Sequence, residues 1–328
     1  MKKWRQIQRC LALVILVLAS QLLFLPSRGE QLAAQEPASS AAARVDRNQI
    51  YGMYSGLALL MDVYHPQKPN GYGTLLILGS AWAAPLEYGA RPLKDSQQEM
   101  SGFLQPLLQG GYTVFVIDHR AAPRFHYPAM IEDAHRAVRF ARYYAKQFGV
   151  NPNRIGAVGY SSGAHLASLL GLMDGAGDQS SRDPVERESG RVQCVVAGGT
   201  PADLGAVGDN PQALALLSAF VGETVPANPA AASALHRKLE EASPVHYVRA
   251  GAPPMLLFHG DADELVPYAG AQELEAALEK VHTPVKLITI QGGTHNSVPQ
   301  LESDAFSGPM VAWLDEYLKQ PSARRGGE

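Results

Sequence analysis

The sequence predicts an α/β protein with a mostly parallel, twisted sheet and helices on both faces. From about Arg44 onward, short apolar runs alternate with longer stretches of helical periodicity, the pattern of βα units in such a sheet. The composition is 46% hydrophobic and 18% charged, which is typical of a globular chain. At 328 residues the chain can bury the core of one large α/β domain, and we find no internal boundary in it.

The strands are predicted from short runs of apolar and β-branched residues. These runs cover residues 57–64, 74–78, 112–118, 155–158, 192–197, 255–258 and 285–290. Helical spacing predicts helices over 129–147, 164–172 and 310–318. The polar stretch 174–191 is interpreted as an exposed loop, and Ala-rich helices over 211–239 predict a small helical insert at about 203–245.

The N-terminus has the pattern of an export signal. Basic residues in the first five positions precede an apolar run over 10–25, and small residues near Ala33 and Ala34 suit cleavage. The run is shorter than the roughly 20 residues of a membrane-spanning helix. We therefore expect a periplasmic or extracellular protein, with an uncleaved membrane anchor as the alternative.

The remaining chain divides simply. We expect a flexible leader over 35–43, rich in Ala and Ser, a single domain over 44–321 and a flexible tail over 322–328.

Charge and metal-ligating residues narrow the possible partners. A net charge of −3 gives no basic excess for binding nucleic acid. Cys10 lies in the expected export signal and Cys194 in a predicted strand, where it is best interpreted as a small buried apolar residue, so no disulfide framework is expected. The histidines show no shared metal-ligand spacing. We expect no metal and no cofactor.

Chemistry is indicated by Gly159-x-Ser161-x-Gly163, placed between a predicted strand and a predicted helix. A sharp strand-to-helix turn with a glycine on each side would expose Ser161 at the carboxyl edge of the sheet. The amide of Ser162, at the helix N-terminus, could then stabilise a developing oxyanion. The alternatives are a structural Gly-Ser turn and, since it is off-centre in the motif, Ser162 as the nucleophile.

A serine nucleophile needs a histidine base oriented by a carboxylate. In folds with this turn the chain order is Ser, then Asp or Glu, then His. His282 and His295 both lie well past Ser161, but His282 precedes the strand over 285–290 and His295 follows it. Only the second position lies at the edge of the sheet where Ser161 is expected. We predict His295 as the base.

Three carboxylates after the strand over 255–258 compete for the role of the acid. Asp261 suits a turn-capping position, and Glu264 suits the start of the next helical segment. Asp263 is favoured, in part because of the resemblance described next.

The chain resembles the α/β-hydrolase superfamily and, within it, secreted bacterial esterases that include carbohydrate acetyl esterases and feruloyl-esterase-like or hormone-sensitive-lipase-like proteins. The segments that carry the resemblance are 61–66, 118–123, 128–133, 159–166 and 243–267. It implies the α/β-hydrolase fold for nearly everything after Arg44. It also implies that the second Asp of His259-Gly260-Asp261-Ala262-Asp263 is the acid.

One segment departs from the family pattern. The family usually carries His-Gly-Gly-Gly-Trp after the early strand, where this chain has Leu78-Gly79-Ser80-Ala81-Trp82. The resemblance implies that the amides of Ser80 and Ala81 join that of Ser162 in an oxyanion hole, with side chains that could narrow the site. Trp82 and Tyr160 are candidate pocket residues, and a packed loop tryptophan is the alternative for Trp82.

These expectations combine into an exported serine hydrolase that cleaves carboxylic esters through an acyl-enzyme. The resemblance implies short acyl groups on carbohydrates, so the expected partner is a small-molecule or carbohydrate ester. No nucleic acid is expected to bind, and no membrane beyond the N-terminal signal. The alternatives are a peptidase of the same fold and a weakly catalytic binding protein with an altered oxyanion loop.

Overall fold

The computed structural model describes residues 42–319 except 96, 231, 232 and 302. The expected export signal, most of the leader and the tail lie outside the described residues. No helix within the described ranges is both long and apolar enough to cross a membrane.

The centre of the molecule is an eight-stranded sheet in the order β1-β2-β4-β3-β5-β6-β7-β8. β2 pairs antiparallel with both β1 and β4, and every other neighbouring pair is parallel. The predicted α/β class is therefore confirmed. The strands are β1 (Ala42–Tyr54), β2 (Leu57–Pro66), β3 (Gly73–Ile77), β4 (Thr113–Ile117), β5 (Ile155–Tyr160), β6 (Val195–Gly198), β7 (Met255–Gly260) and β8 (Val285–Ile290).

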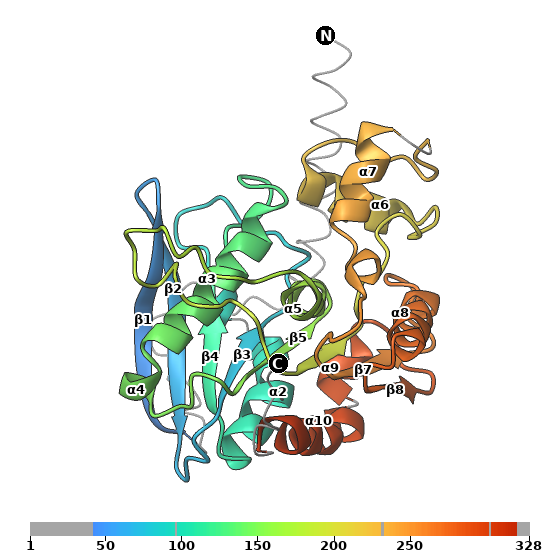
Figure 1. Cartoon of the computed structure of the whole chain (residues 1–328). Helices are drawn as coiled ribbons and strands as arrows, with labels where there is room; N and C mark the ends of the chain where they lie inside the picture. The colour runs from blue at the N-terminus through green and yellow to red at the C-terminus, as the bar shows by residue number, and fades with distance from the viewer. Residues whose placement is uncertain (1–41, 96, 231–232, 302, 320–328) are drawn as a thin grey trace, which may run out of the picture.

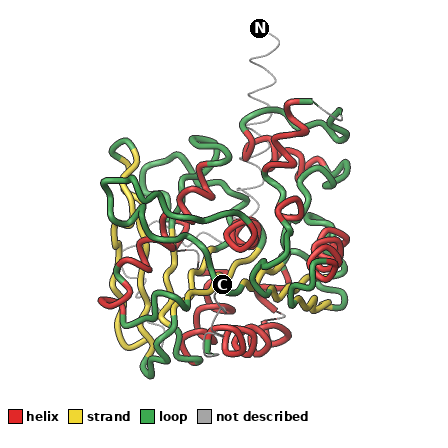
Figure 2. Tube along the Cα trace, viewed as in Figure 1, coloured by secondary structure: helices red, strands yellow, loops and turns green. Residues whose placement is uncertain are grey.

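Helices cover both faces of this sheet (Figures 1 and 2). One face carries α3 (Ala129–Tyr143), α4 (Ala145–Phe148), α5 (Ser162–Leu172) and α8 (Tyr268–Lys280). The other carries α2 (Gln97–Gln109), α9 (Ser297–Leu301) and α10 (Ser303–Leu318). α6 (Pro211–Val221) and α7 (Ala234–Glu241) form the predicted helical insert between β6 and β7, and short 3-10 turns lie at Leu93–Asp95 and Pro244–Tyr247.

The core is divided by the sheet because successive strand residues point to opposite faces. Leu75 and Ile77 of β3 pack with α3 and α5, whereas Leu76, between them, packs with α2 and α10. All three side chains are fully buried. Strands covered on both sides read as continuous apolar runs, which is why the central strands could be predicted from the sequence.

The edge of the sheet differs from expectation. β1 was not among the predicted strands, and it begins at Ala42, two residues inside the expected leader. Its pairing with β2 has three register shifts, and most of its side chains are at least partly exposed. An irregular edge strand of this kind lacks the apolar alternation on which strand prediction depends.

Two other segments also differ. The helix expected over 129–147 is divided at Tyr144 into α3 and α4. The loop over 174–191 is more closely attached to the fold than expected: Val185 is buried, and Glu186 pairs with Arg136 and Arg139 of α3. Its many charged residues suggested a solvated loop, but two of its carboxylates, Asp183 and Glu186, pair with arginines of α3.

Candidate active site

Ser161 lies at the sharp turn between β5 and α5. Its backbone has φ 54° and ψ −125°, a strained conformation for a residue with a side chain. The glycines around it are needed for space: a Cβ at Gly163 would lie 2.0 Å from the carbonyl oxygen of Ile77, and one at Gly159 would lie 2.4 Å from the backbone of Gly163. Glycine at both positions therefore lets the helix return against the sheet and leaves Ser161 projecting at the turn.

His295 lies in the loop after β8, and its Nε2 is 2.9 Å from Ser161 Oγ. The loop reaches this position because it passes closely over β7, where a Cβ at Gly260 would lie 2.0 Å from the carbonyl oxygen of Gly293. Tyr160 adds a second constraint, since its hydroxyl donates to the His295 carbonyl at 2.7 Å. Two contacts therefore hold the His295 loop and keep its imidazole beside Ser161: the close approach to β7 at Gly260, and the hydrogen bond from Tyr160.

Asp263 completes a continuous chain of polar contacts. Its Oδ2 lies 2.7 Å from His295 Nδ1, and its Oδ1 accepts from the amides of Leu265 and Val266 at 2.9 and 2.8 Å. Burial alone would raise the pKa of the Asp263 carboxyl, but the contacts with His259 and His295 outweigh burial and hold the pKa well below its usual range. The Asp263 carboxylate is therefore charged over the whole pH range in which it would orient the His295 imidazole.

The competing residues lie elsewhere. Asp261 Oδ1 accepts from the amide of Gly292 at 2.6 Å, so it ties the two loops together without contacting His295. Glu264 is exposed at the surface. His282 lies in the turn before β8, at the opposite end of that strand from His295.

His259 contacts Asp263, and the sequence did not predict this contact. Its buried Nε2 lies 3.2 Å from Asp263 Oδ2 and 3.1 Å from the carbonyl oxygen of Val266. Both neighbours are acceptors, so Nε2 must carry a proton. Asp263 therefore receives hydrogen bonds from two imidazoles. The only signal in the sequence was the position of His259 four residues before the acid.

The loop that leads from β3 to Trp82 lies against the sharp turn at Ser161, which we call the elbow. Here the amide of Ser80 donates to Ser162 Oγ at 2.9 Å, so it is already engaged within the protein. The amides of Ala81 and Ser162, in contrast, donate to no other group of the described residues. Ala81 and Trp82 both have positive φ, at 52° and 56°, where the family pattern has glycine at the first of them.

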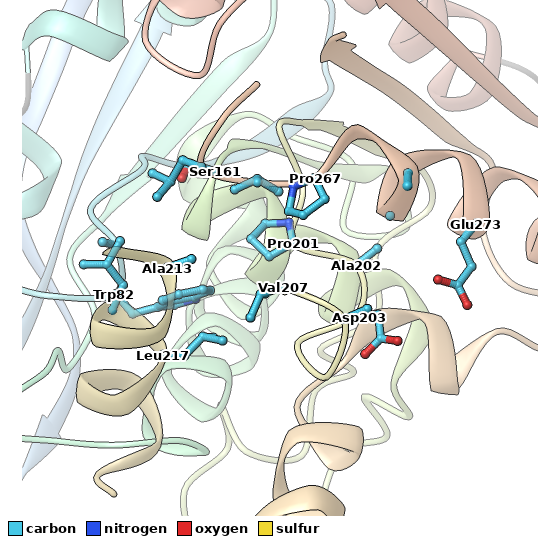
Figure 3. A pocket seen from close by; sticks show the side chains of 17 residues that line it. Trp82, Ser161, Pro201, Ala202, Asp203, Val207, Ala213, Leu217, Pro267 and Glu273 are labelled. Atoms are coloured by element: carbon cyan, nitrogen blue, oxygen red, sulfur yellow. The ribbon is translucent and has the colours of Figure 1, made fainter. Parts of the chain in front are cut away.

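A mostly apolar pocket opens beside Ser161 (Figure 3). Trp82 lies with Ser161 at one end of it, and Asp203 and Glu273 lie toward the other. Tyr160 is not among the lining residues, since it packs beneath the His295 loop. The lining residues are Ala81, Trp82, Ser161, Pro201, Ala202, Asp203, Ala206, Val207, Ala213, Leu216, Leu217, Leu265, Val266, Pro267, Ala269, Gly270 and Glu273.

The sheet order, with Ser161 after β5, Asp263 after β7 and His295 after β8, is that of an α/β hydrolase. A family model described as BD-FAE matches residues 61–278, and the chain belongs to this family of α/β-hydrolase esterases. The match spans the sheet from β2 to β7.

Curated relatives carry esterase names. The probable carboxylic ester hydrolase LipM of Mycobacterium tuberculosis is 29% identical over 70% of this chain and 51% of its own length. The esterase LipC of the same organism is 27% identical over 84% of this chain and 64% of its own length. The chain thus spans about half to two thirds of these two relatives.

Solved structures share the fold. A truncated carbohydrate esterase from gut microbiota aligns with TM-score 0.72 at 24% identity, covering 87% of this chain and all of the other. An acetyl ester-xyloside bifunctional hydrolase from Caldicellulosiruptor lactoaceticus aligns with TM-score 0.65 at 25% identity, covering 79% of this chain and 88% of the other.

Proposed function

We propose that this protein is a serine hydrolase that cleaves carboxylic esters. The observation that carries the proposal is the unbroken contact chain from Ser161 through His295 to Asp263, with distances of 2.9 and 2.7 Å, beside an apolar pocket. Nucleophile, base and orienting acid at hydrogen-bond distance are the arrangement that activates a serine. Esterase names among the curated relatives support the same reaction.

The reaction follows from these positions. Ser161 Oγ attacks the ester carbonyl carbon while His295 Nε2 takes its proton, and the same nitrogen then returns the proton to the leaving alcohol. Asp263 accepts from Nδ1, which fixes the tautomer and stabilises the imidazolium. Water then attacks the acyl carbonyl carbon while His295 Nε2 takes its proton; the bond to Ser161 Oγ breaks, Oγ regains that proton from His295, and the acid product leaves.

The oxyanion is stabilised in this proposal by the amides of Ala81 and Ser162. Both are free to donate, and Ser162 begins α5, whose dipole favours negative charge at that end. Ser80, which was also expected to donate, instead holds the loop against the elbow through Ser162 Oγ. The departure at Leu78-Gly79-Ser80-Ala81-Trp82 thus leaves two donors for a competent site.

Short acyl groups on carbohydrates are the substrates we propose. The solved neighbour named as an acetyl ester-xyloside bifunctional hydrolase supports this class. The pocket beside Ser161 is lined mainly by small and aliphatic side chains, which suit a short acyl chain. We also propose export, on the basis of the N-terminal pattern.

The test is hydrolysis of para-nitrophenyl acetate and butyrate by the chain that begins after Ala34. We expect Ser161→Ala to reduce turnover to the background rate. Ser168→Ala makes the same change on the next turns of α5, away from the pocket, and should keep wild-type turnover. Background rates for folded wild-type protein with these esters and with acetylated xylosides would contradict the proposal and favour a binding protein.

A further inference from the structure

His165 is a fully buried histidine on α5 that the proposed reaction does not use. Its Nδ1 lies 3.1 Å from Trp82 Nε1, and its Nε2 lies 2.7 Å from the carbonyl oxygen of Ala242. An indole nitrogen only donates and a carbonyl only accepts, so Nδ1 must be the acceptor and Nε2 must carry the proton. One tautomer of neutral imidazole satisfies both contacts.

Protonation would break this arrangement, because a charged imidazole has no acceptor left for the indole. The burial of His165 opposes that change and lowers its pKa to about 4. The His165 side chain therefore stays neutral at pH values well above 4, and its hydrogen bond with Trp82 persists there.

Trp82 is the residue through which His165 reaches the proposed oxyanion hole. Trp82 and Ala81 both occupy the left-handed region, which residues with side chains rarely adopt. Backbone hydrogen bonds fix the ends of this turn, from Ala83 to the Ser80 carbonyl and from Ala122 to the Trp82 carbonyl. Neither bond involves the amide of Ala81, which the proposed reaction needs.

The indole is held by two residues, Phe220 and His165. Its ring stacks on Phe220 of α6 at 4.4 Å between centroids, and the His165 ring meets it edge-on at 5.1 Å. His165 provides the acceptor for its N–H. Since Trp82 is only 4% exposed, an indole that lost this acceptor would have no solvent to replace it.

We propose that His165 is a positioning residue that holds the strained Ala81–Trp82 turn, and with it the oxyanion-binding amide of Ala81, by accepting the Trp82 indole hydrogen bond. Glycine at position 81 could adopt this turn at little cost, whereas alanine needs outside support. His165 is well placed to give that support, because it lies on the helix that begins next to Ser161. The inference rests on the proposed esterase function.

The kinetic test compares His165→Leu, which removes the acceptor, with His165→Asn, whose Oδ1 can replace Nδ1. Complete loss of an oxyanion donor costs about 10²- to 10³-fold, and we expect misalignment to lower kcat roughly 10- to 100-fold in His165→Leu. KM should change by less than about 3-fold, since the donor acts mainly on the transition state. His165→Asn should recover most of the activity.

A double-mutant cycle separates positioning from a general structural role. Trp82→Phe removes the donor, so adding His165→Leu to it should cost much less than adding His165→Leu to the wild type. Equal losses on the two backgrounds would overturn the proposal. If His165→Leu does not fold, Trp82→Phe alone is decisive: an unchanged kcat overturns the proposal, and a fall of similar size supports it.

A spectroscopic readout distinguishes this inference from the proposed function. The chain beginning after Ala34 contains two tryptophans, Trp82 and Trp313. In ¹H–¹⁵N spectra of protein with labelled indoles, we expect the Trp82 N–H to resist solvent exchange and to shift in His165→Leu, while Trp313 stays in place. An unmoved Trp82 resonance overturns the inference even in a protein without esterase activity.

Discussion

Asp263 lies between two histidines that approach the same carboxylate oxygen. His295 Nδ1 is 2.7 Å from Oδ2 and His259 Nε2 is 3.2 Å from it, while two backbone amides occupy Oδ1. Each contact removes freedom from the carboxylate, so its direction toward His295 is set by several groups together. In the proposed reaction, a carboxylate positioned in this way can orient His295 without reorganising.

Replacing His259 tests this arrangement. His259→Phe keeps a ring but removes the donor, so we expect kcat to fall roughly 10-fold while KM changes little, a loss equivalent to about 1.4 kcal/mol. His259→Gln can place an N–H near the original Nε2 and should keep more activity. Steady-state kinetics on para-nitrophenyl butyrate give the comparison, and equal kcat for folded wild type and His259→Phe would contradict it.

Asp118, at the end of β4, shows the opposite electrostatic effect. Burial raises the pKa of its carboxyl to about 6, and the nearby Lys94 offsets this only in part. Between pH 4 and 6 the folded state therefore binds more protons at this group than the unfolded state does. Its contribution to stability is present below about pH 4 and falls as the pH rises through 6.

Asp118→Asn should remove this pH dependence, because an amide does not titrate and its Oδ1 can still accept from the Lys94 amide. We expect the variant to gain about 1–2 kcal/mol over the wild type at pH 7 relative to pH 4. Urea unfolding at several pH values measures the difference. A constant offset between the two proteins across this range would contradict the prediction.

Elements bring these residues together by ending at one edge of the sheet. β5, β7 and β8 are parallel, and their carboxyl ends carry Ser161, Asp263 and His295. The sequence could predict this part because β5 and β7 are buried apolar runs, β8 is rich in β-branched residues, and the glycines of the elbow flank the serine. β1 could not be predicted, because its pattern is that of an irregular, partly exposed edge.

The sequence was less informative about contacts that depend on two elements at once. Tyr160 was expected in the pocket, but its hydroxyl donates to the His295 carbonyl. The role of Ser80 likewise depends on how closely its loop approaches Ser162, which no local pattern encodes. Motif and strand order therefore predict the candidate reacting groups, whereas the contacts that hold those groups in place follow only from packing.

The helical insert supplies one wall of the pocket. α6 begins at an Asn210 cap and places Ala213 and Leu217, one turn apart, on the side that faces Trp82 and Ser161. A larger side chain at Ala213 would fill part of the pocket that Ser161 also lines. Acyl chain length should therefore depend on this helix.

Ala213→Leu should lower kcat/KM for para-nitrophenyl butyrate roughly 10-fold or more and affect the acetate less. The new leucine would occupy space that the butyryl chain needs and the shorter acetyl group does not. The exposed neighbour Gln212 offers a matched control, since Gln212→Leu adds the same side chain outside the pocket. An unchanged butyrate-to-acetate ratio in Ala213→Leu would show that the acyl chain lies elsewhere.

At the scale of the whole molecule, the described domain follows an N-terminal segment whose sequence has the pattern of an export signal. Expression of the full chain in a bacterium with a general export pathway should yield a mature protein that begins near Ala34 or Gln35. Intact mass and N-terminal sequencing of the periplasmic fraction measure this directly. Recovery of the full-length chain in the membrane fraction would favour the alternative, an uncleaved anchor.

The whole molecule also explains why one reactive serine is expected. The sheet orders three loops, the close contact between Gly260 and Gly293 brings two of them together, and the loop containing Trp82 closes over the elbow. Together, these contacts determine the position of Ser161. Its covalent reactivity is the central claim of this account.

The most direct measurement is reaction with a para-nitrophenyl alkylphosphonate followed by peptide mass spectrometry. We predict one phosphonyl adduct on the peptide that contains Ser161, absent from Ser161→Ala and strongly reduced in His295→Gln. An adduct retained by folded Ser161→Ala, or no adduct on folded wild-type protein that hydrolyses esters, would contradict the account.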